Sequence, residues 1–137
     1  MFPNGTVITP DGRTLIVGES FAARFTAFDI QADGSLTNRR EWATCESGTP
    51  DGCCLDAEGA IWYASPVSNE CVRIAEGGRV LDRVPLVNQG FCCMLGGPDR
   101  RTLFIGTAVD SDPAHCRQTR TGAIEIVTVD VPGAGLP

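Results

Sequence analysis

An internal repeat of strand, tight turn and strand constrains this chain most strongly. The sequence TPDGCCLDAEGAIW (residues 49–62) repeats FPNGTVITPDGRTL (residues 2–15), with Asp51 aligned on Asn4. In both copies Pro-Asp-Gly or Pro-Asn-Gly opens a short apolar stretch. An acidic residue followed by Gly lies seven positions after the aligned side chain, and a second apolar stretch begins there. The pattern predicts two antiparallel strands joined by a tight turn in each copy.

A third and more divergent copy spans residues 91–103, and it puts Cys92 in the place of Asn4 and Asp51. Copies spaced by roughly 40 to 47 residues, each built from short strands, are typical of the blades of a β-propeller. We therefore predict an all-β chain of about three propeller blades. Their approximate bounds are residues 3–45, 50–87 and 90–130. A closed propeller needs at least four blades, so the chain is predicted to be part of a ring.

The pattern inside each repeat predicts strands throughout. Apolar residues recur at period two, and Gly and Pro interrupt the chain about every ten residues, so we expect no helix. The expected strands cover residues 6–9, 14–19, 24–30, 36–43, 53–55, 61–64, 71–75, 80–85, 92–95, 103–107 and 124–129. The third blade lacks a fourth strand, so exposed sheet faces and unpaired edges are expected. Trp42 and Trp62 are predicted to pack between blades.

Charge and hydropathy exclude several classes of partner. The net charge of −6 makes nucleic acid and anionic lipid surfaces poor partners. No apolar run approaches the length of a membrane span, and the N-terminus has no basic segment followed by an apolar one. We therefore expect a cytoplasmic location, with neither nucleic acid nor a membrane as partner.

The seven Cys residues are predicted to be free thiols. Cys53-Cys54 and Cys92-Cys93 are adjacent pairs inside apolar strands, the chain has no C-x-x-C spacing, and it has one His. Zinc sites and disulfide frameworks use other spacings. Buried thiols that pack as small apolar side chains are the expected outcome.

A set of short motifs resembles one known family when taken in order along the chain. The motifs are PNG (3–5), TPDGRTL (9–15), LTNRR (36–40), PDG (50–52), DAEG (56–59) and GGPD (96–99). Together they are similar to the C-terminal half of the gluconolactonase/regucalcin (senescence marker protein, SMP-30-like) family, over essentially the whole chain. The resemblance implies half of a six-bladed propeller. It also implies a metal-dependent hydrolase of sugar lactones or related small esters.

The same resemblance implies a site for one divalent metal, typically Ca²⁺, with Zn²⁺, Mg²⁺ or Mn²⁺ as alternatives. The family's ligands are a Glu, two Asn and an Asp at the mouth of the central channel. Asn4 matches one Asn, and Asp51 matches the Asp, which is also the proposed catalytic base. The Glu and the other Asn belong to the family's upstream half. Alone, this chain is therefore expected to lack appreciable activity, and activity is expected when the missing N-terminal half is restored. The expected partner is that half or a second copy in a homodimer.

The residues themselves support this site, and they also allow a simpler interpretation. Equivalent positions at the start of inner strands converge on a propeller axis, and the hard oxygens of Asn4 and Asp51 suit calcium or magnesium. Alternatively, each side chain caps its own turn, with Gly following for a positive φ. Asp11, Asp33, Asp56 and Asp99 are expected to be ordinary turn residues.

Five further residues are weaker candidates, and two other functions remain open. Glu19, Ser20 and Asn69 either reach the channel mouth or cap loops. Cys92 is expected to be a packed thiol that could touch the site, and His115 has no Ser or Asp at a spacing that suggests a triad. The alternative functions are a non-catalytic calcium-binding or scaffold propeller and a truncated, inactive product.

Overall fold

Three antiparallel sheets form the computed structural model, which describes residues 2–135. Blade 1 contains β1 (Pro3–Ile8), β2 (Thr14–Glu19), β3 (Arg24–Ile30) and β4 (Leu36–Thr44) in that order. Blade 2 contains β5 (Cys53–Leu55), β6 (Ile61–Ser65), β7 (Glu70–Ile74) and β8 (Val80–Pro85). Blade 3 contains β9 (Gln89–Gly96), β10 (Thr102–Ala108) and β11 (Ala123–Thr128). The predicted all-β fold of about three blades is confirmed, with strand bounds that differ by a few residues.

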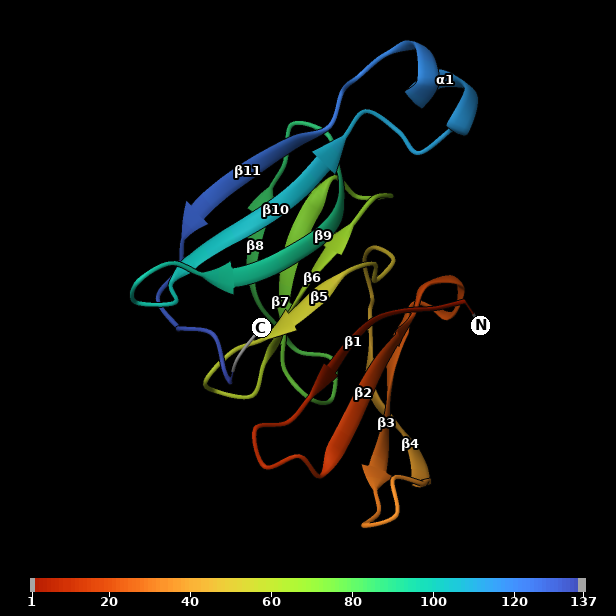
Figure 1. Cartoon of the computed structure of the whole chain (residues 1–137), viewed down its shortest axis with the longest axis vertical. Coiled ribbons are helices and arrows are strands. Elements are labelled where there is room, and N and C mark those ends of the chain that lie inside the picture. Colours follow the sequence, from red (N-terminus) through yellow and green to blue (C-terminus); the bar gives the residue numbers. More distant parts are fainter. Residues whose placement is uncertain (1, 136–137) are drawn as a thin grey trace.

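The innermost strands β1, β5 and β9 lie next to one another around a common axis (Figure 1). The same backbone hydrogen bond joins each pair of neighbouring blades. Gly5 N–H donates to Asp51 O (3.1 Å) between blades 1 and 2, and Gly52 N–H donates to Phe91 O (2.9 Å) between blades 2 and 3. A cavity of about 360 Å³ beside these strands is lined by residues of all three. The eleven described strands thus form a propeller segment that does not close into a ring.

Apolar side chains fill the two spaces between neighbouring blades. Between blades 1 and 2 the buried core includes Phe25, Trp42 and Tyr63, whose rings meet edge to face. Between blades 2 and 3 it includes Trp62 and Leu103. The prediction that both Trp residues pack between blades is confirmed. Each large apolar side chain buried in this way contributes about 1.5–3 kcal/mol, so the blades hold one another in place.

The segment after β11 returns to blade 2 at the far end of the axis. Ala57 N–H donates to Pro132 O (2.8 Å), and Ala134 N–H donates to Leu55 O (3.0 Å). Ala134 also packs against the core between blades 1 and 2. The C-terminal segment therefore ties blade 3 to the turn that follows β5.

The expectation of no helix is wrong at two places. A 3-10 turn, η1 (Ser20–Ala22), follows β2, and α1 (Pro113–Gln118) lies in the loop between β10 and β11. Asp112 caps α1, because its carboxylate accepts from Ala114 N and His115 N, both at 2.9 Å. Proline at the first helical position adds to this start signal. The period-two pattern did not reveal this polar loop helix because α1 buries no residue.

The third repeat is shifted by one residue relative to the predicted alignment. Phe91 O, and not an atom of Cys92, accepts the bond equivalent to the one that Asp51 O accepts from Gly5. Cys92 therefore corresponds to Gly52. A Cβ on Gly52 would lie 2.7 Å from Cys92 Cα, so the approach of the next blade requires glycine there. No described blade packs on the outer side of Cys92, and its side chain is exposed.

All seven cysteines are free, as predicted. Five are buried, whereas Cys92 and Cys116 are exposed, so the expectation of burial is wrong for these two. Cys53 faces the core shared with blade 1 and Cys54 faces the core shared with blade 3, as strand alternation requires. No helix among the described residues is long and apolar enough to cross a membrane.

Candidate functional site

Asn4 and Asp51 lie together at the end of the axis where the inner strands begin. Asn4 is in β1, and Asp51 lies two residues before β5. The Gly5–Asp51 backbone bond holds the two loops side by side. Both side chains are half-buried, and the Asn4 amide lies close enough to the Asp51 carboxyl group to lower the pKa of that group. The structure thus brings the two predicted ligands together, and their metal-binding role stays a prediction.

The environment of Asp51 changes the affinity of its carboxyl group for protons. Burial raises the pKa of Asp51 above its ordinary value, while hydrogen bonds from the Asn4 side chain and the Gly52 N–H oppose part of that rise. A carboxylate that has lost part of its hydration gains strongly from a cation placed beside it. This location therefore suits a carboxylate that binds a positive ligand.

Ser20 positions both loops through two hydrogen bonds. Asn4 Nδ2 donates to Ser20 Oγ (3.2 Å), and Ser20 Oγ donates to the carbonyl oxygen of Pro50 (2.7 Å). Ser20 is buried in η1, directly after β2. Because the amide nitrogen of Asn4 is engaged by the hydroxyl, the orientation of its amide is fixed relative to the peptide that precedes Asp51. Ser20, a weaker candidate from the sequence, is a positioning residue here.

Glu19 serves blade 1 and does not project freely from the mouth. Its carboxylate accepts from Thr26 Oγ1 (2.5 Å), Arg24 Nη2 (3.0 Å) and Arg39 Nη2 (3.0 Å). Asn69 adopts a left-handed φ of 50°, which fits a turn role. Neither arrangement marks these side chains as ligands.

His115 pairs with an aspartate in the loop that contains α1. Its Nδ1 contacts the Asp110 carboxylate, and the pKa of Asp110 is held below its ordinary value by this bond. Cys116 Sγ also contacts Asp110, through the backbone carbonyl at 3.6 Å. These contacts are local to the exposed loop. The structure thus gives His115 an acidic partner, Asp110, that the sequence spacing did not lead us to expect.

The donor set of Asn4 and Asp51 fits a hard divalent cation in type but not in number. Calcium takes six to eight oxygen ligands and magnesium six. Phe91, the equivalent residue of blade 3, has no side-chain oxygen. Among residues 2–135, no group of three or more His, Cys, Asp or Glu side chains is placed to hold a metal ion. The described chain thus contributes two oxygen-bearing side chains to a larger site.

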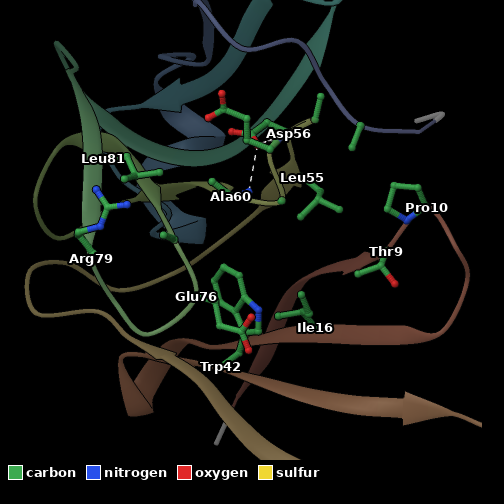
Figure 2. Close-up of a pocket in the computed structure, with 15 residues that line it drawn as sticks. Thr9, Pro10, Ile16, Trp42, Leu55, Asp56, Ala60, Glu76, Arg79 and Leu81 are labelled. Carbon is green, nitrogen blue, oxygen red and sulfur yellow. Dashed lines mark hydrogen bonds between the residues drawn. The ribbon is translucent and has the colours of Figure 1, made fainter.

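A cavity of about 810 Å³ lies at the opposite ends of the inner strands, between blades 1 and 2 (Figure 2). Thr9, Ile16 and Trp42 line it from blade 1, and Asp56 lies across from them. Asp56 is fully buried. Its carboxylate is satisfied there, because it accepts from Arg73 Nε (2.7 Å) and from the Glu58 and Ala60 N–H groups. Asp56 is therefore a turn residue as predicted, and an ion-paired one. Its engaged carboxylate does not mark this cavity as a second site.

Fold and site together define a class: a partial β-propeller with an oxygen-donor pair at the mouth of its axis. Residues 1–109 match the family model described as "SMP-30/Gluconolactonase/LRE-like region". The chain belongs to this family.

Three similar proteins show how much of such a molecule the chain represents. Regucalcin of Xenopus laevis is 31% identical over 91% of this chain and 44% of its own length. The 6-deoxy-6-sulfogluconolactonase of Pseudomonas putida is 27% identical over 100% of this chain and 49% of its own length. The crystal structure of regucalcin from Agrobacterium tumefaciens, titled a calcium-binding protein, superposes with a TM-score of 0.78 and 25% identity, over 98% of this chain and 48% of its own. The chain thus spans about half the length of these relatives.

Proposed function

We propose that this chain is the C-terminal half of a metal-dependent hydrolase of sugar lactones or related small esters. The single observation that carries the proposal is the joined pair of Asn4 and Asp51 at the channel mouth of a family fold. The similarity to a lactonase of Pseudomonas putida supports the substrate class. We also propose a cytoplasmic location, because all seven cysteines are free thiols.

In the proposed site Asn4 and Asp51 hold a divalent cation, with Ca²⁺ as the first choice for two hard oxygen donors. When bound, the cation supplies positive charge that polarises the ester carbonyl and stabilises the oxyanion. Asp51 has a second task, to orient the attacking water and accept its proton. Ser20 fixes the orientation of the Asn4 amide, and it holds the Pro50 carbonyl beside Asp51. The remaining oxygen ligands come from outside the described chain.

Hydrolysis of glucono-δ-lactone, followed through acid release with a pH indicator, tests this function. We expect no appreciable turnover by the 137-residue chain with added Ca²⁺, because the Glu and the second Asn of the family's ligand set are absent. Turnover should return when an upstream three-blade half is joined to the chain, and Asp51→Asn in that longer protein should abolish it. Robust turnover by the chain alone, or turnover that survives Asp51→Asn, contradicts the proposal.

A second candidate is a calcium-binding propeller without catalysis. The similarity to a regucalcin whose crystal structure is titled a calcium-binding protein favours it. The same longer protein separates the two candidates, since calcium binding without lactone turnover would support the second. A truncated, inactive product would show neither property when the upstream half is joined.

A further inference from the structure

The outer face of blade 3 is apolar and unpartnered in the described structure. Met94, Phe104 and Ile126 form one cross-strand row, in which Phe104 pairs with both of the others. The next row on the same face contains Cys92, Gly106 and Ile124. Ile124 and Ile126 are 67% and 66% exposed, and Met94 and Phe104 are exposed as well. We call these two rows the leading face.

The internal repeat shows what such a face does elsewhere in the molecule. The cross-strand pair Val7 and Ile16 of blade 1 packs toward blade 2, and the pair Cys54 and Trp62 of blade 2 packs toward blade 3. With the one-residue shift described above, Met94 and Phe104 are the equivalent pair of blade 3. On two of three blades, then, this face is buried against the blade that follows.

The complementary face is present on blade 1. Leu55 and Ile61 of blade 2 face the blade before it, as Leu95 and Leu103 of blade 3 do. The equivalent row of blade 1 contains Ile8, Leu15 and Phe28, and Ile8 is 54% exposed. We call this row the trailing face. The chain thus has both surfaces of an interblade contact, the leading face on blade 3 and the trailing face on blade 1. Neither surface is covered by another blade in the described structure.

We propose that, in the 137-residue chain without an upstream half, a second copy of the chain occupies both faces and closes the ring. Three blades account for 44–49% of the length of the similar proteins, which corresponds to half a turn of the ring. A two-fold rotation about the propeller axis then places the leading face of each copy against the trailing face of the other. The assembly is closed, so it ends at two copies and does not extend into a filament.

Closure would also change the mouth of the channel. It brings two copies of the Asn4 and Asp51 pair around one axis, which provides four oxygen-bearing side chains and two negative charges. A calcium site gains affinity with ligand number and charge. One cation per dimer is the stoichiometry that follows.

The molecular mass in solution tests directly whether two copies of the chain associate. Sedimentation equilibrium in EDTA at about 10–100 μM, a range that reveals dimers of micromolar affinity, should give twice 14.5 kDa. Because EDTA removes divalent metal, this result does not depend on the proposed site or activity. Ile126→Lys should weaken association at least about 100-fold, since a lysine would be buried without a partner. Ile8→Lys should do the same from the trailing face.

Val87→Lys is the matched control, because Val87 is 83% exposed and belongs to neither face. It should sediment like the wild type, and circular dichroism should show all three variants folded. A monomeric wild type at 100 μM overturns the proposal, as does a dimer that both Ile126→Lys and Ile8→Lys leave intact. So does a chain that stays monomeric alone and binds one copy of an N-terminal regucalcin half, because the occupant is then that half.

Discussion

Two identical tetrapeptides show how position decides the role of a residue. Asp11 and Asp51 both stand in Thr-Pro-Asp-Gly. The Asp11 carboxylate accepts from Thr9 Oγ1 (2.6 Å) and Arg13 N (3.1 Å) in an exposed turn, whereas Asp51 is half-buried at the axis beside Asn4. The repeat register predicted this difference. It could not predict the hydrogen bonds of Ser20 or the place of Phe91, because these depend on how close neighbouring blades approach.

The thiols give a test at the residue scale. Burial raises the pKa of Cys45 to about 11 and that of Cys53 to about 12. Alkylation of the native protein at pH 8 should therefore label Cys116 and spare the five buried thiols, with peptide mass spectrometry as the readout. Cys92 lies on the leading face, so it should react in the monomeric Ile126→Lys variant and be protected in the dimer. Denaturation without reductant should make all seven reactive. Labelling of Cys53 as fast as Cys116 in the native protein would contradict the described packing.

The same pKa shifts set a direction for stability against pH. A thiol whose pKa is higher in the folded than in the unfolded chain favours folding fully below the unfolded pKa, near 9. That contribution is lost as pH rises toward about 11 and 12. The urea midpoint should accordingly fall between pH 9 and 11 and show no fall from thiol ionisation between pH 7 and 8.

At the scale of elements, the strand order was predictable and the links between elements were not. Short apolar stretches bounded by Gly, Pro and Asp located every strand. Some alternate because one face is exposed, and others, such as β6, are largely apolar because both faces are buried. The ion pair of Asp56 and Arg73 joins the turn after β5 to β7, and the C-terminal segment pairs with the same turn. Neither link leaves a periodic signal, since each joins single residues that are distant in sequence.

This ion pair predicts an unequal effect for two similar substitutions. The Asp56 side chain is 0% exposed, and Asp56→Asn removes the carboxylate that accepts from Arg73 Nε. Arg73 keeps its ion pair with Glu58, so the expected loss is about 1–3 kcal/mol. Asp29 pairs with Arg40 at the surface, where such a pair contributes about 0–1 kcal/mol. Urea unfolding should therefore show a larger loss for Asp56→Asn than for Asp29→Asn. Equal losses would mean that the Asp56 pair is not buried as described.

At the scale of the whole molecule, the chain is a family member that spans about half of its relatives. Among residues 2–135, blade 3 has three strands and two sheet faces are open, and the repeat count predicted both features. The resemblance of short motifs predicted the family and the site, and the structure brings Asn4 and Asp51 together. Which molecule covers the open faces depends on association, and a single sequence has no pattern that reports it.

Calcium titration of a matched pair of variants tests the central claim most directly, that Asp51 is a metal ligand at the propeller mouth. Isothermal calorimetry on the wild-type chain should give weak binding of one cation per dimer, with a dissociation constant on the order of 10⁻⁴–10⁻³ M. The binding is weak because four side-chain donors are fewer than the six to eight oxygen ligands that calcium takes. Asp51→Asn should weaken it at least about tenfold, which is about 1.4 kcal/mol. Asp11→Asn, the same change in the same tetrapeptide, should leave it unchanged. Binding that is equally affected by both substitutions, or by neither, would contradict the account.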